Sequence, residues 1–299
     1  MTNELKRYLK NKKNLEDAFL YNQGHEHDSC GVGFVASTDG KQRREVVQGG
    51  IDALKAVWHR GAVDADGKTG DGAGILTQIP YNFFDDEIAK TGHEKRDEPL
   101  GIGMMFLPRN DYAALEKCRT IIESELLDHG YYIYGWRQVP INNSVIGEKA
   151  NSTRPEIEQV MFVNNIERDK DFDFAKELYL VRRRLEKRIA KQQINGFYVC
   201  SLSFESIIYK GLFLAEQLSI FYPDLANEEF ISSFAVFHQR YSTNTFPSWG
   251  LAQPFRMLAH NGEINTISGN TNWMRNHQTR ITTEIFGDDS EQVKPIIEK

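Results

Sequence analysis

Cys30-Gly31-Val32-Gly33-Phe34-Val35-Ala36 is the stretch at which the character of this chain changes. Residues 1–29, which precede it, are polar and charged and are predicted to form an extension outside the core. The small and apolar residues of 31–36 predict a buried strand that begins directly after Cys30. Cys30 therefore has two interpretations: a small core residue, or a thiol nucleophile that becomes N-terminal when residues 1–29 are removed.

The second interpretation gives Cys30 a complete chemistry of its own. Removal of residues 1–29 would turn its backbone nitrogen into a free α-amine, whose pKa near ~7.7 lets it accept a proton at neutral pH. One residue would then supply both the nucleophile and the base, which an amide nitrogen in an uncut chain cannot do. Cys118 and Cys200 lie in a predicted helix and an apolar strand, and both are expected to be ordinary buried thiols.

Composition limits the classes of protein to which the chain can belong. Its 299 residues carry 36 basic and 42 acidic side chains, a formal net charge of −6, and 40% are hydrophobic, which is typical of a globular protein. The acidic balance argues against a nucleic-acid-binding module, which would show a basic face or stripe. No apolar run approaches the ~18 residues of a membrane span. Three separated cysteines, with no Cys-x-x-Cys pair and no secretory signal, argue against zinc or iron–sulfur ligation and favour the reducing cytoplasm.

The order of the predicted elements favours an α+β fold, because strands and helices mix without strict βαβ alternation. Residue 30 is the only break in composition, so a single domain is expected over 30–299. Thr38-Asp39-Gly40 predicts a hairpin turn with Arg44–Gln48 as the returning strand. Asn110 is expected to cap a helix. Strands are predicted near 74–80, 101–107, 131–136, 159–163, 196–202, 205–209, 232–241 and 256–260, and helices near 51–58, 110–127, 172–192, 213–221 and 264–278.

Two early motifs have both a structural and a functional interpretation. Trp58-His59-Arg60-Gly61 is either a helix end, with a cap glycine and basic residues that suit the helix dipole, or a turn that places Arg60 at the mouth of a pocket. The second motif is Thr69-Gly70-Asp71-Gly72-Ala73-Gly74. A phosphate-binding loop would need a strand before it and a helix after it, but here a polar stretch precedes the motif and a predicted strand follows it. It predicts a tight turn or bulge that enters a strand.

Two later motifs carry polar chemistry at predicted strand ends. Arg240 opens Arg240-Tyr241-Ser242-Thr243-Asn244-Thr245, followed by Phe246-Pro247-Ser248-Trp249, and could bind a carboxylate bidentately or form a surface ion pair. His260-Asn261-Gly262-Glu263 is a strong turn signal, yet no alternating return strand follows it. The Asn261 amide and the Gly262 backbone N–H could instead form an oxyanion hole, in which one donor is typically worth ~3–4 kcal/mol.

Taken together, these motifs resemble the class II glutamine amidotransferases, and among them the glutaminase domain of the glutamate synthases. The parts shared by the whole class are Cys30, His59-Arg60-Gly61 and His260-Asn261-Gly262. The parts that point specifically to the glutamate synthases are Ser242-Thr243-Asn244-Thr245-Phe246-Pro247-Ser248-Trp249 and Asn270-x-Asn272-Trp273-Met274. Ala252-Gln253-Pro254 also carries the resemblance.

The resemblance implies an N-terminal-nucleophile hydrolase fold, a four-layer αββα sandwich of two antiparallel sheets, with residues 1–29 as a propeptide. Cys30 would attack glutamine and form a γ-glutamyl thioester, while Asn261 and Gly262 hold the oxyanion. Arg240 would bind the substrate carboxylate. The remaining predicted substrate-binding residues are Arg60, Ser242 and Thr243.

The resemblance also implies a longer parent protein. Its synthase domain would receive the ammonia and combine it with 2-oxoglutarate, using FMN and an iron–sulfur cluster fed by an electron-donating subunit or carrier. No cofactor or metal is expected in this chain. An aspartate that holds the substrate amine is expected beyond Lys299, so the chain reads as a C-terminally truncated domain.

Two alternatives remain open at this point. The chain could be an inactive amidotransferase fold that serves as an interaction or regulatory module. It could also be a cysteine hydrolase of another class, with His59 or His260 as the base.

Overall fold

The computed structural model of the chain describes residues 3–18, 22, 31–240, 246–257, 266–280 and 285–297. It divides into two compact units, Met1–Cys30 and Gly31–Lys299. The first unit contains helix α1 (Asn3–Asp17), which the sequence pattern did not predict. All other elements belong to the second unit.

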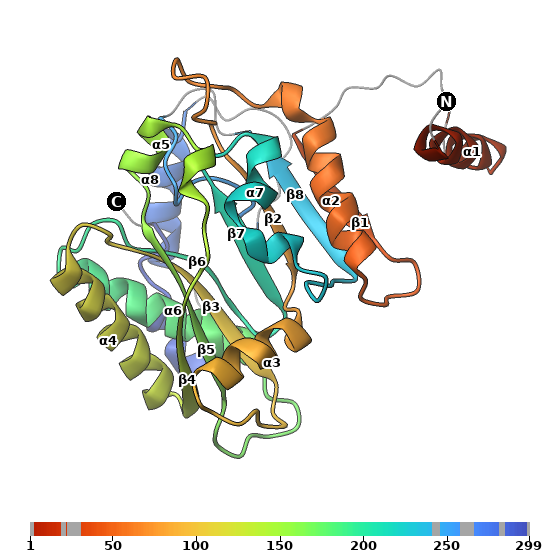
Figure 1. The fold of residues 1–299 in the computed structure, drawn as a ribbon. Coiled ribbons are helices and arrows are strands. Elements are labelled where there is room, and N and C mark those ends of the chain that lie inside the picture. The colour runs from red at the N-terminus through yellow and green to blue at the C-terminus, as the bar shows by residue number, and fades with distance from the viewer. Residues whose placement is uncertain are drawn as a thin grey trace. The chain divides into compact units, whose positions relative to one another are not determined.

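The first sheet has four strands in the order β1-β8-β2-β7, and every neighbouring pair is antiparallel (Figure 1). Its members are β1 (Val32–Ala36), β2 (Ala73–Gln78), β7 (Ser206–Gly211) and β8 (Phe234–Gln239). The partner of β1 is therefore β8, from the far end of the chain, and not a neighbouring hairpin strand.

The second sheet has four antiparallel strands in the order β4-β5-β3-β6. Its members are β3 (Leu100–Leu107), β4 (Tyr131–Gln138), β5 (Glu156–Asn164) and β6 (Tyr198–Ser203). All residues of β3 are buried, because the strand is covered on both faces. Phe204 and Glu205 connect β6 directly to β7, so this short turn joins the two sheets.

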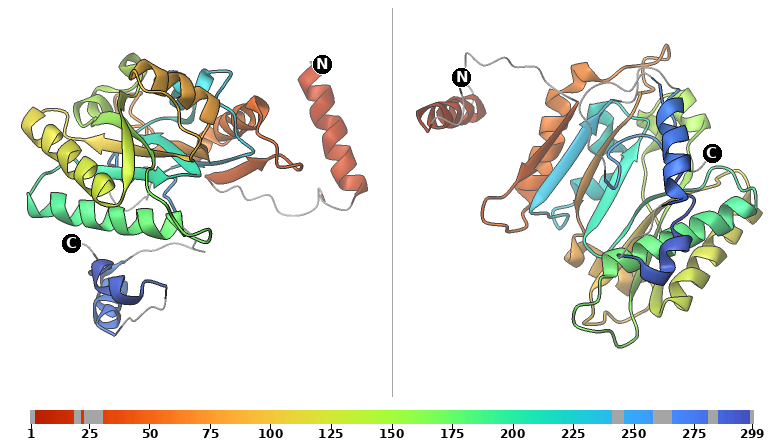
Figure 2. Two further views of the ribbon diagram at one scale, coloured as in Figure 1. Left: turned by 90° about the horizontal axis from the view of Figure 1, so that it is seen from below. Right: turned by 180° about the vertical axis from the view of Figure 1, so that it is seen from behind.

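The helices cover the sheets. α2 (Arg44–Ala56) packs on β8 and β1, whereas α4 (Tyr112–Asp128) and α6 (Phe174–Lys191) lie side by side along the second sheet (Figure 2). The shorter helices are α3 (Tyr81–Lys90), α5 (Glu148–Ser152), α7 (Leu218–Phe221) and α8 (Ser268–Gln278), with 3-10 turns η1 (Trp58–Arg60), η2 (Asn143–Val145), η3 (Ala215–Gln217), η4 (Pro223–Ala226) and η5 (Gly287–Gln292). Two antiparallel sheets with covering helices confirm the predicted α+β class.

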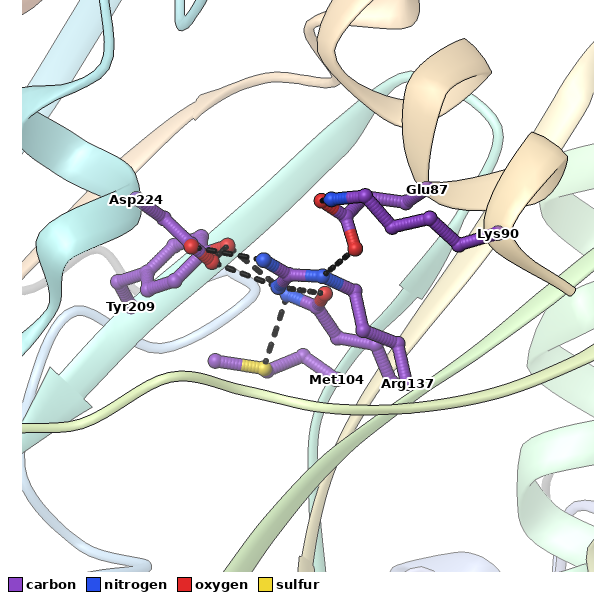
Figure 3. A network of polar contacts seen from close by, with 7 residues as sticks. Glu87, Lys90, Met104, Arg137, Tyr209 and Asp224 are labelled. Carbon is purple, nitrogen blue, oxygen red and sulfur yellow. Dashed lines mark hydrogen bonds and ion pairs between the residues drawn. The ribbon is translucent and has the colours of Figure 1, made fainter.

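Residues of both sheets contribute to one hydrophobic cluster, and a polar network inside it connects them (Figure 3). The guanidinium of Arg137 on β4 donates to both carboxylate oxygens of Asp224 at 2.7 and 2.8 Å, and to Glu87 of α3 at 2.7 Å. The hydroxyl of Tyr209 on β7 donates to Asp224 at 2.8 Å and accepts from the Gln159 amide of β5 at 2.9 Å. Every member of the network therefore has a partner, as buried polar groups require.

The predicted return strand Arg44–Gln48 is wrong, because these residues begin helix α2. The buried residues of α2 follow the helical period and begin before Ile51, where the predicted helix begins. They are Val46, Val47, Gly50, Ile51 and Leu54. Trp58 does not continue this face, since its side chain is 66% exposed.

Three smaller expectations also differ from the structure. Asp111, not Asn110, caps α4, because its carboxylate accepts from the Ala114 N–H at 3.0 Å. The helix predicted near 213–221 is divided between η3 and α7. Residues 256–257 are not in a strand, and the rest of the strand predicted there lies outside the described residues.

Candidate active site

The end of strand β8 brings distant parts of the chain together. The Gln239 N–H donates to the Gly31 carbonyl at 2.5 Å, and the Arg240 N–H donates to the Gly72 carbonyl at 2.9 Å. Gly31 follows the candidate nucleophile in the sequence, and Gly72 ends the glycine-rich turn. Arg240 therefore leaves the sheet between the start of the chain's first strand and that turn.

The backbone here is strained at a residue that is not glycine. Arg240 has φ +111, a conformation that L-residues adopt at an energetic penalty. Its neighbour Gly72 has φ +136. A Cβ atom on Gly31 would collide with the Gln239 carbonyl oxygen. Close backbone approach and strain at one point are typical of functional sites.

The Arg60 turn packs against the same strand end. η1 (Trp58–Arg60) follows α2, and a Cβ atom on Gly61 would collide with the side-chain amide of Gln239. Gly61 has φ −79, so it is not the left-handed cap glycine of the structural interpretation. Glycine is required here by packing against β8. Arg60 and Arg240, far apart in sequence, are thus both placed at this end of the sheet.

Two side chains at this position have buried polar atoms without a hydrogen-bond partner within the described residues. Gln239 is fully buried, yet neither its amide nitrogen nor its amide oxygen has a hydrogen-bond partner there, and neither has the buried Nε atom of Arg60. Because buried polar atoms are nearly always paired, these groups mark a place where further polar groups fit. Gln239 was not singled out in the sequence; its polar side chain on the buried face of an apolar strand was the available signal.

A loop with several internal hydrogen bonds places Gly72 next to Arg240. Val63 pairs with Gly70, and the Asp71 N–H donates to the Ala62 carbonyl at 3.0 Å. The Asp66 carboxylate accepts from the hydroxyl and the backbone N–H of Thr69, and these hydrogen bonds lower its pKa to about 2. The segment is therefore a tight turn that enters β2, as predicted.

Residues 246–257 follow Arg240 and the undescribed residues 241–245. The ring of Trp249 is buried, and its Nε1–H donates to the Ala150 carbonyl at 3.0 Å. Phe246 is the exposed aromatic residue of this segment, at 94%. The segment is therefore anchored in the core a few residues after Arg240.

Several predicted site residues cannot be placed. Cys30, Ser242, Thr243, Asn261 and Gly262 lie outside the described residues, as does His260, so Arg60 and Arg240 are the predicted site residues with a described position. His59, one of the two alternative bases, has an exposed side chain on η1.

The other two cysteines are poor nucleophiles. Cys118 of α4 and Cys200 of β6 are free and buried. Burial raises the pKa of Cys118 to about 11 and that of Cys200 to about 12, so both remain protonated near neutral pH. This confirms their interpretation as structural thiols.

Other kinds of site leave little trace in the described part of the chain. No group of three or more His, Cys, Asp or Glu side chains there could hold a metal ion, and no helix there is long and apolar enough to cross a membrane. A cavity of about 840 Å³ borders the start of α4, the end of α6 and residues 247–251. Its described lining contains Arg109, Arg154 and Trp249 but neither Arg60 nor Arg240, so it is distinct from the site at the end of β8.

Comparison with known families decides what this arrangement belongs to. The family model "Glutamine amidotransferases class-II" matches residues 30–299, starting at the candidate nucleophile. The chain belongs to the class II glutamine amidotransferases. The predicted family resemblance is therefore confirmed, and within this class the end of β8 is the candidate active site.

Curated relatives of this class II amidotransferase chain include three long proteins. The glutamate synthase [NADPH] large chain of Azospirillum brasilense is 62% identical over 95% of this chain. The chloroplastic ferredoxin-dependent glutamate synthase of Spinacia oleracea is 42% identical over 94% of it, and the glutamate synthase [NADH] of Saccharomyces cerevisiae is 41% identical over 94%. This chain spans only 19%, 17% and 13% of their respective lengths.

Proposed function

We propose that this chain hydrolyses the side-chain amide of glutamine to glutamate and ammonia. The observation that carries the proposal is the family match that starts at Cys30, together with the strand end that gathers Gly31, Gly61 and Arg240. The polar groups of Arg60 and Gln239 left unsatisfied there support a polar substrate.

The proposed reaction begins with removal of residues 1–29. The free α-amine of Cys30 takes the thiol proton, and the sulfur attacks the glutamine Cδ to form a tetrahedral oxyanion. Asn261 and Gly262 donate hydrogen bonds to this oxyanion. Its collapse releases ammonia, with the proton returned to the leaving nitrogen, and leaves a γ-glutamyl thioester. Water then hydrolyses the thioester to glutamate and regenerates the thiol.

Substrate recognition is assigned to the residues around Arg240. Its guanidinium would bind the α-carboxylate of glutamine with two parallel hydrogen bonds. The strained backbone of Arg240 supports this role, because strain at one residue persists where the surrounding structure holds it for function. Arg60, Ser242 and Thr243 would line the remainder of the glutamine site.

The released ammonia would serve glutamate synthesis in a longer protein. The names of the long relatives support a glutamate synthase context, with NADPH, ferredoxin or NADH as electron source in the three cases above. We place no cofactor in this chain; FMN and an iron–sulfur cluster, which the resemblance implies for the parent, would belong to other regions together with the synthase domain. Cysteine usage supports the cytoplasm as the location.

The test is ammonia release from glutamine by the purified chain, with Cys30→Ala as the control. Ammonia release that depends on Cys30 supports the proposal, and no release by the folded, cleaved chain contradicts it. Acetylation of the mature α-amine with the thiol intact separates the two mechanisms. Activity should disappear if the amine is the base, and it should persist if a histidine is. No described feature favours the alternative of an inactive interaction module.

A further inference from the structure

Lys210 of β7 is a buried amine that the proposed reaction does not use. Its side chain is fully buried, and Nζ donates to the Gly250 carbonyl at 2.8 Å and to the Tyr198 hydroxyl at 3.4 Å. The ammonium also lies 4.4 Å from the centre of the Tyr198 ring and 4.9 Å from that of Phe255, which makes two cation–π contacts.

This lysine has no carboxylate partner among the described residues. The charged or titratable groups near its ammonium among those residues are Tyr198, whose hydroxyl accepts its hydrogen bond, Arg256, from the same segment as Phe255, and the thiol of Cys200 on β6. Burial is the main cause that lowers the pKa of Lys210 to about 8, and the positive charge of Arg256 adds to it. The contacts thus do not offset the penalty of burying the charge, and an apolar side chain would be less costly to the fold.

The contacts of Lys210 converge on residues 246–257. Besides Gly250 and Phe255, this segment is held by Arg256, whose guanidinium donates to the Val199 carbonyl. A Cβ atom on Gly74 would lie 2.6 Å from the Gln253 carbonyl oxygen, so the segment crosses β2 in direct contact with its backbone. Lys210 therefore connects β7 to a segment laid across the sheet.

The segment that Lys210 contacts lies close to the candidate site. Arg240 is fixed on one side of residues 241–245 by its hydrogen bond to Gly72. Gly250 is fixed on the other side by Lys210. A Cβ atom on Gly72 would lie 3.3 Å from that of Ala252, so the segment also packs against the glycine that holds Arg240.

We propose that Lys210 is a positioning residue for glutamine binding, which anchors residues 246–257 through Gly250 and thereby holds Ala252 against Gly72, the glycine that fixes Arg240. The assignment of glutamine as the ligand rests on the proposed function. The anchoring itself rests on the described contacts alone.

Lys210→Met tests the anchor, because methionine fills a similar volume without a donor or a charge. Lys191→Met, at an exposed position on α6, is the matched control. Two further variants separate the hydrogen bond of Tyr198 to Lys210 from its cation–π contact. Tyr198→Phe keeps the ring face and removes the hydroxyl, whereas Tyr198→Leu removes the ring.

Two readouts are required. Hydrogen–deuterium exchange should become faster in residues 246–257 of Lys210→Met and Tyr198→Leu, and stay near wild type in Tyr198→Phe and Lys191→Met. The KM for glutamine should rise about tenfold in Lys210→Met, since a hydrogen bond from a charged donor is lost, while kcat changes much less. The melting temperature should be equal to that of the wild type or higher.

Unchanged exchange in 246–257 overturns the proposal, and so does faster exchange throughout the core, which would make Lys210 a general stabiliser. An unchanged KM with locally faster exchange overturns the link to glutamine. If the wild-type chain itself releases no ammonia, the proposed function fails. The exchange comparison then still supports or overturns the anchoring.

Discussion

Arg240 and Gly72 are joined at the end of β8 by a hydrogen bond of 2.9 Å from the Arg240 N–H to the Gly72 carbonyl, and both have positive φ. Glycine adopts such a φ without penalty, so the backbone strain of the pair lies at Arg240, directly after β8. This pairing holds the proposed carboxylate-binding arginine at the end of β8, directly beside the glycine that follows Cys30.

Gly72→Ala should therefore impair the site more than an ordinary glycine substitution does. A side chain at φ +136 is strongly disfavoured, so we expect a loss of about 2 kcal/mol or more in the free energy of unfolding, together with a raised KM for glutamine. Gly67→Ala is the control: φ is +69 there, and a Cβ atom would meet no neighbour. It should retain full activity. Equal effects of both substitutions on KM would contradict the account; urea denaturation and steady-state kinetics measure them.

Gly61 and Gln239 should show compensating substitutions. Gly61→Ala alone places a methyl group on the Gln239 amide, which should destabilise the chain by about 1–3 kcal/mol. In a Gln239→Ala background the space is free, and the same substitution should have little effect. A double-mutant cycle in urea gives the coupling free energy. A coupling near zero would show that the two residues do not pack as described.

Arg137 should be among the residues most sensitive to truncation. Arg137→Ala leaves the buried carboxylate of Asp224 without its guanidinium partner, so we expect a loss of about 3–5 kcal/mol in the free energy of unfolding. Lys95→Ala removes an exposed ion pair to Asp85 and should change that energy by about 1 kcal/mol or less. Comparable losses in the two variants would argue against a buried network that joins the sheets.

Lys210 predicts a specific pH dependence of stability. Its pKa is about 8 in the folded chain and 10.5 when unfolded, so between these values the unfolded state binds more protons. The free energy of unfolding should therefore rise with pH across this window relative to that of Lys210→Met, by up to about 3 kcal/mol. The comparison with the variant removes the contribution of tyrosines that titrate in the same range. A difference that is constant from pH 7 to 10 would contradict the lowered pKa.

Local patterns were enough to predict much of the fold. The apolar runs of β3 and β5 and the amphipathic pattern of α6 each indicate one type of element, and the structure contains them with small shifts at the ends. Arg44–Gln48 was misassigned because its two adjacent valines fit a strand as well as a helix. Only contacts with β8 show that they continue the buried face of α2.

The site was predictable in its residue types more than in its geometry. Motif residues such as Arg240 could be named from the chain alone. The requirement for glycine at position 61 could not be predicted, because it comes from a contact with Gln239, which is far away in sequence. Lys210 was overlooked for the same reason. The aromatic rings that contact it come from β6 and from the segment after Arg240, and no local sequence pattern relates these two parts of the chain.

In the proposed reaction Cys30, as the first residue of the mature chain, carries the glutamyl group. The most direct measurement is mass spectrometry of the chain, quenched in acid during turnover of glutamine and digested into peptides. We expect a peptide that begins at Cys30 and bears one γ-glutamyl group, which is absent from Cys30→Ala. A γ-glutamyl group on another residue, or turnover by a chain that still carries residues 1–29, would contradict it.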